Sequence, residues 1–166
     1  IGHTGETHWG TGFDILEVGH SMALFCETAD GADRNAFVAN NLYADGDGLK
    51  RHYTDQTVSI LLRAGFIAFR TDASGTAGAV FTPSERMRIT EDGNVGIGTT
   101  SPVGLLTLYD PASGDNKLRF QNSTTGVTTS DGSRIGLNGA ELFINNIESS
   151  NIKIYTGSTQ TQGITI

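Results

Sequence analysis

The side chains best suited to bind a transition metal are four histidines in the first third of the chain, His3, His8, His20 and His52. Zinc and iron sites use closely spaced histidine pairs that are supported by cysteine or carboxylate ligands. His3 and His8 are separated by four residues, and no second pair follows them. This spacing predicts surface histidines and no metal site.

Residues 30–33 and 45–48 are acidic stretches similar to part of a calcium-binding loop. Calcium takes about six to eight oxygen ligands, and an EF-hand loop closes with a glutamate at its twelfth position. When Asp45 is counted as the first position, Gln56 occupies the twelfth, so the pattern fails. Both stretches instead predict two-residue Asp-Gly hairpin turns.

The chain shows no recognisable constellation for catalysis. Residues 93–98 are rich in glycine, but they neither open a helix nor end in the lysine that a phosphate-binding loop needs. Ser21 lies beside His20 without forming a nucleophile elbow or a triad pattern. We therefore expect no catalytic residue, no cofactor and no enzymatic activity. A carboxylate pair for glycan cleavage can be distant in sequence, so this alternative stays open.

A few aromatic side chains could contact a glycan. Glycine neighbours leave the indole face of Trp9 accessible for stacking on a sugar ring, although a buried contact between subunits would use the same side chain. Tyr43 and Tyr53, with His52, form a second polar and aromatic group with the same two interpretations. Trp9, Tyr43 and Tyr53 are thus weak candidates for glycan contact.

The composition favours an oligomer. The 166 residues include 22 glycines and 3 prolines, and only 37% are hydrophobic, which is below the usual share for a globular domain. Because a single chain of this kind buries little apolar surface to offset its chain entropy, association of several chains is the natural remedy.

The charge and the remaining composition exclude several classes of function. A net charge of −7 without a basic run argues against a nucleic-acid partner, because phosphate binding needs a basic surface. One cysteine, Cys26, excludes an intrachain disulfide and is expected to be a buried thiol. No apolar run reaches the roughly 18 residues of a membrane helix. The sequence pattern already looks ongoing at Ile1, and the chain stops at Ile166 without a terminator-like tail, so we expect a fragment of a longer protein.

Short apolar runs recur along the chain and are separated by Gly, Asp, Asn or Ser, which predicts an all-β fold. The predicted strands are residues 15–18, 22–25, 36–38, 58–62, 66–70, 79–81, 86–89, 105–108, 118–120, 141–144 and 152–155.

Residues 85–102 are the most informative segment. Met87 and Ile89 alternate with polar residues in a strand, Gly93 and Asn94 form a turn, and a second short strand follows. In that second strand, Val95 and Ile97 alternate with glycines 96 and 98. A strand face made only of glycine predicts the close approach of another backbone, and we expect that backbone to belong to another chain.

This segment, which reads ERMRI and then GNVGIGTTSP, resembles a motif of tail-fibre and related receptor-binding proteins of tailed bacteriophages. The likeness covers roughly residues 41–108 and, more weakly, residues 131–166. The residues that carry the fibre motif are Arg86, Met87, Ile89, Gly93, Asn94, Val95, Gly96, Ile97 and Gly98. The resemblance implies an intertwined homotrimer, and it brings no catalytic residue with it.

We predict two β modules. The first comprises residues 1–102 and ends in the GNVGIGTTSP hairpin, and the second comprises residues 103–166. Residues 67–74 align without gaps with residues 152–159, so the second module is expected to be a truncated repeat of the first. Residues 121–133 are nearly all polar or glycine and predict a long loop or a weak strand pair.

Together these observations predict an elongated homotrimer of β modules, in the form of a β-prism or a triangular β-helix. We expect a structural part of a phage tail fibre, assembled in the host cytoplasm and present in the virion. Its partners would be other tail or capsid proteins and a bacterial surface glycan or protein, with no nucleic acid and no membrane insertion. Two alternatives stay open: a virion or capsid-decorating trimer without receptor binding, and a fragment of a polysaccharide-degrading tailspike.

Overall fold

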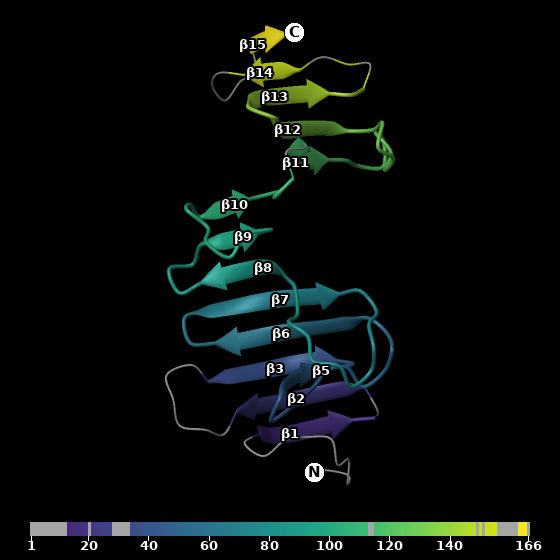
Figure 1. Ribbon diagram of the computed structural model, residues 1–166. Helices are drawn as coiled ribbons and strands as arrows, with labels where there is room; N and C mark the ends of the chain where they lie inside the picture. The colour runs from purple at the N-terminus through teal and green to yellow at the C-terminus, as the bar shows by residue number, and fades with distance from the viewer. Residues whose placement is uncertain are drawn as a thin grey trace. The chain divides into compact units, whose positions relative to one another are not determined.

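The computed structural model describes residues 13–19, 21–27, 34–112, 115–148, 150, 152–155 and 163–165 (Figure 1). These residues form strands β1 to β15 and contain no helix, so the predicted all-β fold is confirmed for them. The chain divides into two compact units, Ile1–Tyr109 and Asp110–Ile166. Trp9 lies outside the described residues.

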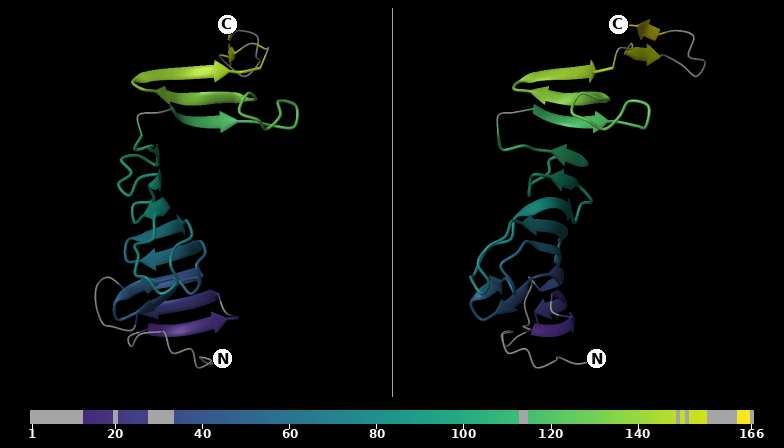
Figure 2. Two further views of the ribbon diagram at one scale, coloured as in Figure 1. Left: turned by 45° about the vertical axis from the view of Figure 1, so that its right-hand side comes forward. Right: turned by 90° about the vertical axis from the view of Figure 1, so that its right-hand side faces the viewer.

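The first unit is built around an open, eight-stranded sheet in the order β1-β2-β3-β6-β7-β8-β9-β10, which the two views of Figure 2 show from other sides. Its strands are β1 (Phe13–Val18), β2 (Met22–Glu27), β3 (Asn35–Asn40), β6 (Thr57–Arg63), β7 (Phe66–Asp72), β8 (Glu85–Thr90), β9 (Val95–Ile97) and β10 (Leu106–Leu108). All neighbours are antiparallel except β9 and β10, which are parallel. Strands β4 (Tyr43–Asp45) and β5 (Gly48–Lys50) form a separate hairpin, as the Asp-Gly sequence predicts.

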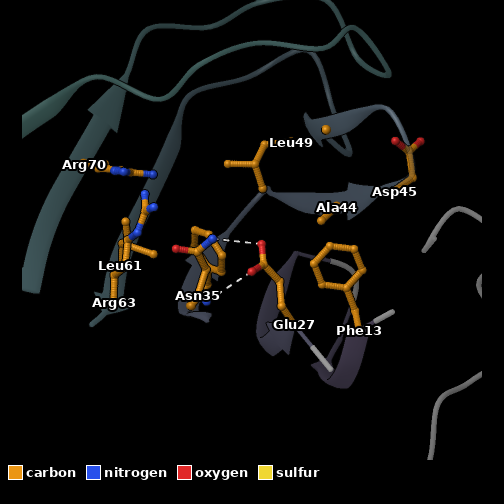
Figure 3. Close-up of a pocket in the computed structure, with 11 residues that line it drawn as sticks. Phe13, Glu27, Asn35, Ala44, Asp45, Leu49, Leu61, Arg63 and Arg70 are labelled. Carbon is orange, nitrogen blue, oxygen red and sulfur yellow. Dashed lines mark hydrogen bonds between the residues drawn. The ribbon is translucent and has the colours of Figure 1, made fainter. Parts of the chain in front are cut away.

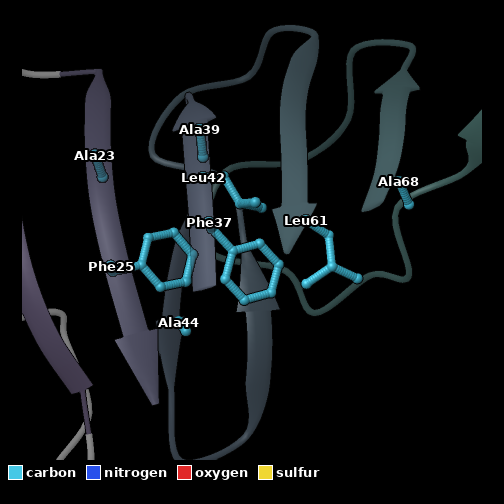
Figure 4. Close-up of a cluster of buried hydrophobic side chains, with 8 residues drawn as sticks. All are labelled: Ala23, Phe25, Phe37, Ala39, Leu42, Ala44, Leu61 and Ala68. Atoms are coloured by element: carbon cyan, nitrogen blue, oxygen red, sulfur yellow. The ribbon is translucent and has the colours of Figure 1, made fainter. Parts of the chain in front are cut away.

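The core lies on one face of this sheet, which we call the covered face. Phe25, Phe37, Leu61 and Ala68 are register partners across β2, β3, β6 and β7, and all four are buried. The rings of Phe25 and Phe37 stack with their centroids 4.5 Å apart (Figure 4). Ala23, Ala39, Leu42 and the hairpin residue Ala44 complete the cluster.

The segment that covers this face is fixed by polar contacts to its own backbone. Asn41 is buried with a positive φ of 56°, which asparagine tolerates better than most residues. Its side-chain amide donates to the carbonyl oxygens of Tyr53 (3.2 Å) and Gln56 (2.9 Å), and its Oδ1 accepts from the Tyr53 N–H (2.8 Å). The guanidinium of Arg51 lies 3.6 Å from the centre of the Phe81 ring. These contacts hold residues 41–56 and 73–84 together as one layer.

A short link joins the parallel strands β9 and β10. Parallel strands usually need a crossover of about a dozen residues or more, whereas here residues 98–105 suffice. The backbone of this link passes very close to Gly96. A Cβ atom added to Gly96 would lie only 2.6 Å from the carbonyl oxygen of Thr99. A Cβ on Gly98 would meet the carbonyl oxygen of Tyr109, and Gly98 has a positive φ of 78°. The predicted close backbone approach at these glycines is therefore made by the same chain.

In the second unit, β11 (Asp115–Phe120), β12 (Ser133–Asn138) and β13 (Glu141–Asn146) form an antiparallel sheet, and β14 (Lys153–Tyr155) pairs with β15 (Gly163–Thr165). The polar loop that precedes β12 is closed by Asp131, whose carboxylate accepts from the Thr128 N–H at 2.8 Å. This bond is the main reason that the pKa of Asp131 is lowered from its ordinary value. Of the predicted repeat, residues 156–159 lie outside the described residues.

The sequence prediction did not include β12, and two further features differ from it. Residues 79–81 do not form a strand and contribute one isolated bridge, between Lys50 and Val80. The units meet between Tyr109 and Asp110, whereas the sequence placed the boundary after residue 102. The reason is that β10 pairs back onto β9, so the Ser101-Pro102 segment is an internal link of the first unit.

Replacing Gly96 by alanine is expected to destabilise the first unit by about 1–3 kcal/mol. The new methyl group would overlap the Thr99 carbonyl oxygen, which belongs to the backbone of the short link, so the link would have to shift. Thermal unfolding followed by circular dichroism would measure the loss. Gly104→Ala is the matched control, since it lies in the same link with open space around it. Equal melting temperatures for the two variants would contradict this account of the link.

Candidate functional site

The structure separates the two tyrosines that sequence reasoning grouped together. The Tyr43 side chain is packed inside the first unit, with only 8% of the residue exposed, and its ring lies 4.9 Å from that of His52. Tyr53 is 49% exposed. His52 also lies near Glu17, a residue of strand β1, with 3.8 Å between His52 Nε2 and Glu17 Oε1. Of these two tyrosines, Tyr53 presents the larger exposed surface for stacking.

The residues that the sequence resemblance assigned to a fibre motif form the β8–β9 hairpin. Thr90 and Asn94 close the turn, with the Thr90 N–H donating to the Asn94 carbonyl at 2.9 Å. Gly93 takes the positive φ, at 81°. Met87 pairs with Ile97 and Ile89 pairs with Val95, which places all four on one face of the sheet. The Arg86 side chain is exposed and donates to Thr71 on the neighbouring strand.

These four side chains belong to an apolar surface that crosses the whole sheet. We call it the open face, and the strand register defines it from β1 to β10. Its apolar members are Leu16, Val18, Met22, Leu24, Ala36, Val38, Val58, Ile60, Leu62, Ile67, Phe69, Met87, Ile89, Val95, Ile97, Leu106 and Leu108. None of them is buried. An exposed apolar patch this extensive is unusual for a monomer and typically marks an interaction site.

Neighbouring residues of one strand show the contrast between the two faces. Leu61 points to the covered face and is 1% exposed, while Leu62 points to the open face and is 44% exposed. Beside Leu16, Leu24 and Val38 the open face is hollowed into a shallow groove of about 430 Å³. Such a groove can accept side chains from a partner surface.

The sheet of the second unit repeats this one-sided pattern. Register places Leu118, Ile135 and Ile144 side by side on one face, and all three are exposed. Leu142, on the same face, is 73% exposed. On the opposite face Arg119 pairs with Arg134, and Arg134 with Asn145. Each unit thus presents an apolar sheet face to its surroundings.

The Asp-Gly hairpin holds a compact ion-pair cluster. Lys50 Nζ lies 2.7 Å from Asp45 Oδ2 and 3.2 Å from Asp47 Oδ2. The hydrogen bond from Lys50 is the main reason that the pKa of Asp45 is lowered, and the bond to Asp45 is the main reason that the pKa of Lys50 is raised. The carboxylates therefore already have a cation in this place, and the cluster serves to fix the turn.

Within the described residues no group of three or more His, Cys, Asp and Glu side chains is arranged to hold a metal ion. In the same part of the chain no helix has the length and apolarity to cross a membrane. Comparison of the chain with protein-family models, curated proteins and solved structures gives no match. The interpretation of the open face consequently depends on its own residues.

Replacing Lys50 by glutamine is expected to raise the pKa of Asp45 toward the ordinary value of 3.8, because the main cause of its lowering is removed. NMR titration of the carboxyl carbons would measure this change. A lowered folded-state pKa contributes stability above the unfolded value, and that contribution is lost as the pH falls through the folded-state pKa. The stability difference between the parent and Lys50→Gln should therefore shrink in that acidic range. An unchanged Asp45 titration in the variant would disprove the coupling.

Proposed function

We propose that this chain is a structural segment of a bacteriophage tail fibre that assembles as a homotrimer and takes part in host attachment. The observation that carries the proposal is the open face, which crosses eight strands and contains no buried side chain. The resemblance of residues 85–102 to the fibre motif supports the same assignment, because Met87, Ile89, Val95 and Ile97 of that motif are part of the open face.

Identical copies of the chain are the occupants that best fit this face. Nine of its larger side chains are each more than a third exposed, and covering them would contribute on the order of 10 kcal/mol per chain. That gain is of the size needed to offset the entropy cost of association, roughly 4–15 kcal/mol. The second unit presents an apolar face of its own, which the same unit of another copy would cover in the same way.

A β-prism is the arrangement that we propose for the three chains. Each chain would turn its open face to a common interior, where side chains such as Leu62 and Phe69 meet their equivalents from the other copies. The layer of residues 41–56 and 73–84, which lies over the covered face, would then meet solvent. Other virion proteins and a bacterial surface receptor complete the proposed set of partners, and repeated copies of a weak receptor contact would act together.

Light scattering on the purified chain is expected to give three times its mass of 17.6 kDa. Leu62→Asp should convert the trimer to monomers, because three carboxylates would be buried without partners in the common interior. Ala64→Asp is the matched control: it adds the same charge two residues away, in the exposed β6–β7 turn, and should stay trimeric. A parent chain that scatters as a monomer would contradict the assembly.

The place of the chain in the virus has its own test. Gold-labelled antibodies against the purified chain should mark the tail appendages of the phage that encodes it, and an excess of the trimer should slow adsorption of that phage to its host. Labelling over the capsid without any effect on adsorption would favour a decoration protein. Release of reducing ends from host polysaccharide would favour the depolymerase alternative.

A further inference from the structure

The turn between β12 and β13 contains an exposed asparagine that is directly followed by glycine. Asn138 is the last residue of β12 and pairs with Glu141, the first residue of β13. Gly139 and Ala140 form the two-residue turn between them, and Gly139 has a positive φ of 57°. Glycine at the first position of such a turn is typical of a type II′ hairpin. The full sequence has no other asparagine that is followed by glycine.

The side-chain amide of Asn138 is not held in place. It is exposed and makes no hydrogen bond to any described residue. Other asparagine side chains of the chain are engaged: Asn41 donates to two backbone carbonyls, and Asn146 donates to Ser150. Asn122 Oδ1 accepts two backbone N–H groups of its own loop. The amide of Asn138 is therefore free to turn toward its own main chain.

The backbone N–H that follows this amide is equally accessible. The Gly139 N–H makes no hydrogen bond to another described residue, and a Cβ added to Gly139 would meet nothing within 4 Å. Because glycine has no side chain, nothing on residue 139 shields its nitrogen from the Asn138 side chain. The turn asparagine of the first unit, Asn94, is instead followed by Val95, whose β-branched side chain crowds the nitrogen.

We propose that Asn138 is a site of spontaneous deamidation. The Gly139 nitrogen attacks Asn138 Cγ, the Cγ–Nδ2 bond breaks, and Nδ2 leaves as ammonia with the proton that the Gly139 nitrogen has lost. The product is a succinimide ring, and water then opens it. Addition of water at Cγ gives aspartate, whereas addition at the main-chain carbonyl carbon gives isoaspartate. Water is the co-reactant, and no atom is oxidised or reduced.

The hairpin controls when this reaction occurs. Pairing with Glu141 holds the Asn138 backbone extended, and in that conformation the side chain points away from the next N–H. Ring closure therefore requires the Asn138 main chain to rotate out of the strand. Among the described residues β13 is an edge of its three-stranded sheet, so the end of the hairpin can open locally without unfolding the unit. Once the turn is open, attack gains from the fixed proximity of the two groups.

Both products weaken the β12–β13 pairing. Aspartate at position 138 places a carboxylate directly opposite Glu141, and like charges at opposed positions destabilise an antiparallel pair. Isoaspartate adds a methylene group to the main chain between the two strands. The turn sets the register that pairs Leu137 with Leu142 on the apolar face of this sheet. Deamidation thus loosens the hairpin that presents this face.

The test is incubation of the purified full chain at mildly alkaline pH, where base assists the loss of the Gly139 amide proton. Tryptic digestion then releases Asn138 in the peptide of residues 135–153, and fragmentation in the mass spectrometer separates it from the other asparagines of that peptide. Conversion of Asn138 to the acid should be at least about tenfold faster than conversion of Asn94, equivalent to a barrier lower by about 1.4 kcal/mol. Equal rates at the two positions would overturn the proposal.

Asn138→Gln is the matched variant, because it keeps an exposed amide on a longer side chain that closes a ring less readily. It should stay unmodified over the same period. Hydrogen exchange at the β12 and β13 amides should become faster in the aged parent and stay unchanged in aged Asn138→Gln. Unchanged exchange in a fully converted parent would overturn the loosening of the hairpin. Neither measurement depends on the proposed assembly, since both are read from the second unit of whichever oligomer the chain forms.

Discussion

The apolar side chains of the main sheet lie on both of its faces, and the described part of the chain buries only one of them. Leu24 beside Phe25 and Leu61 beside Leu62 illustrate this constraint, because each pair places one side chain in the core and the other at the surface. A half-buried antiparallel strand normally alternates apolar and polar residues. Strands that are apolar on both faces occur where both faces are covered. We propose that copies of the same chain supply the cover for the open face.

The glycines of the fibre motif serve a different purpose from the one that their sequence first indicates. A face made of Gly96 and Gly98 predicts a close backbone contact, and the structure places that contact between β9 and its own link to β10. The link can be short because Gly96 and Gly98 have no side chains that would block its path. The short link lets β10 pair in parallel with β9, and this pairing places Leu106 and Leu108 beside Val95 and Ile97 on the open face.

Much of the fold could be predicted from the sequence, because strand formation here depends on local patterns. All of the predicted apolar runs except residues 79–81 became strands, and the Asp45-Gly46-Asp47-Gly48 stretch became a hairpin. What local patterns cannot give is which distant segments meet. Tyr43 is buried because the hairpin folds over the sheet, and Val80 pairs with Lys50 instead of extending a strand. The module boundary was displaced for the same reason, since Leu106 finds its partner back at Val95.

The cavity of about 190 Å³ between the main sheet and the β4–β5 hairpin could not be found from the sequence for a related reason (Figure 3). Arg63 and Arg70 lie on neighbouring strands with Gly65 between them in the turn, and in sequence both look like ordinary solvated residues. Only the register and the hairpin above them bring their side chains to one cavity with Asn35 from β3. The two faces of the sheet thus acquire different roles. An apolar face can bury the chain against its copies, which leaves the opposite face to present its polar groups.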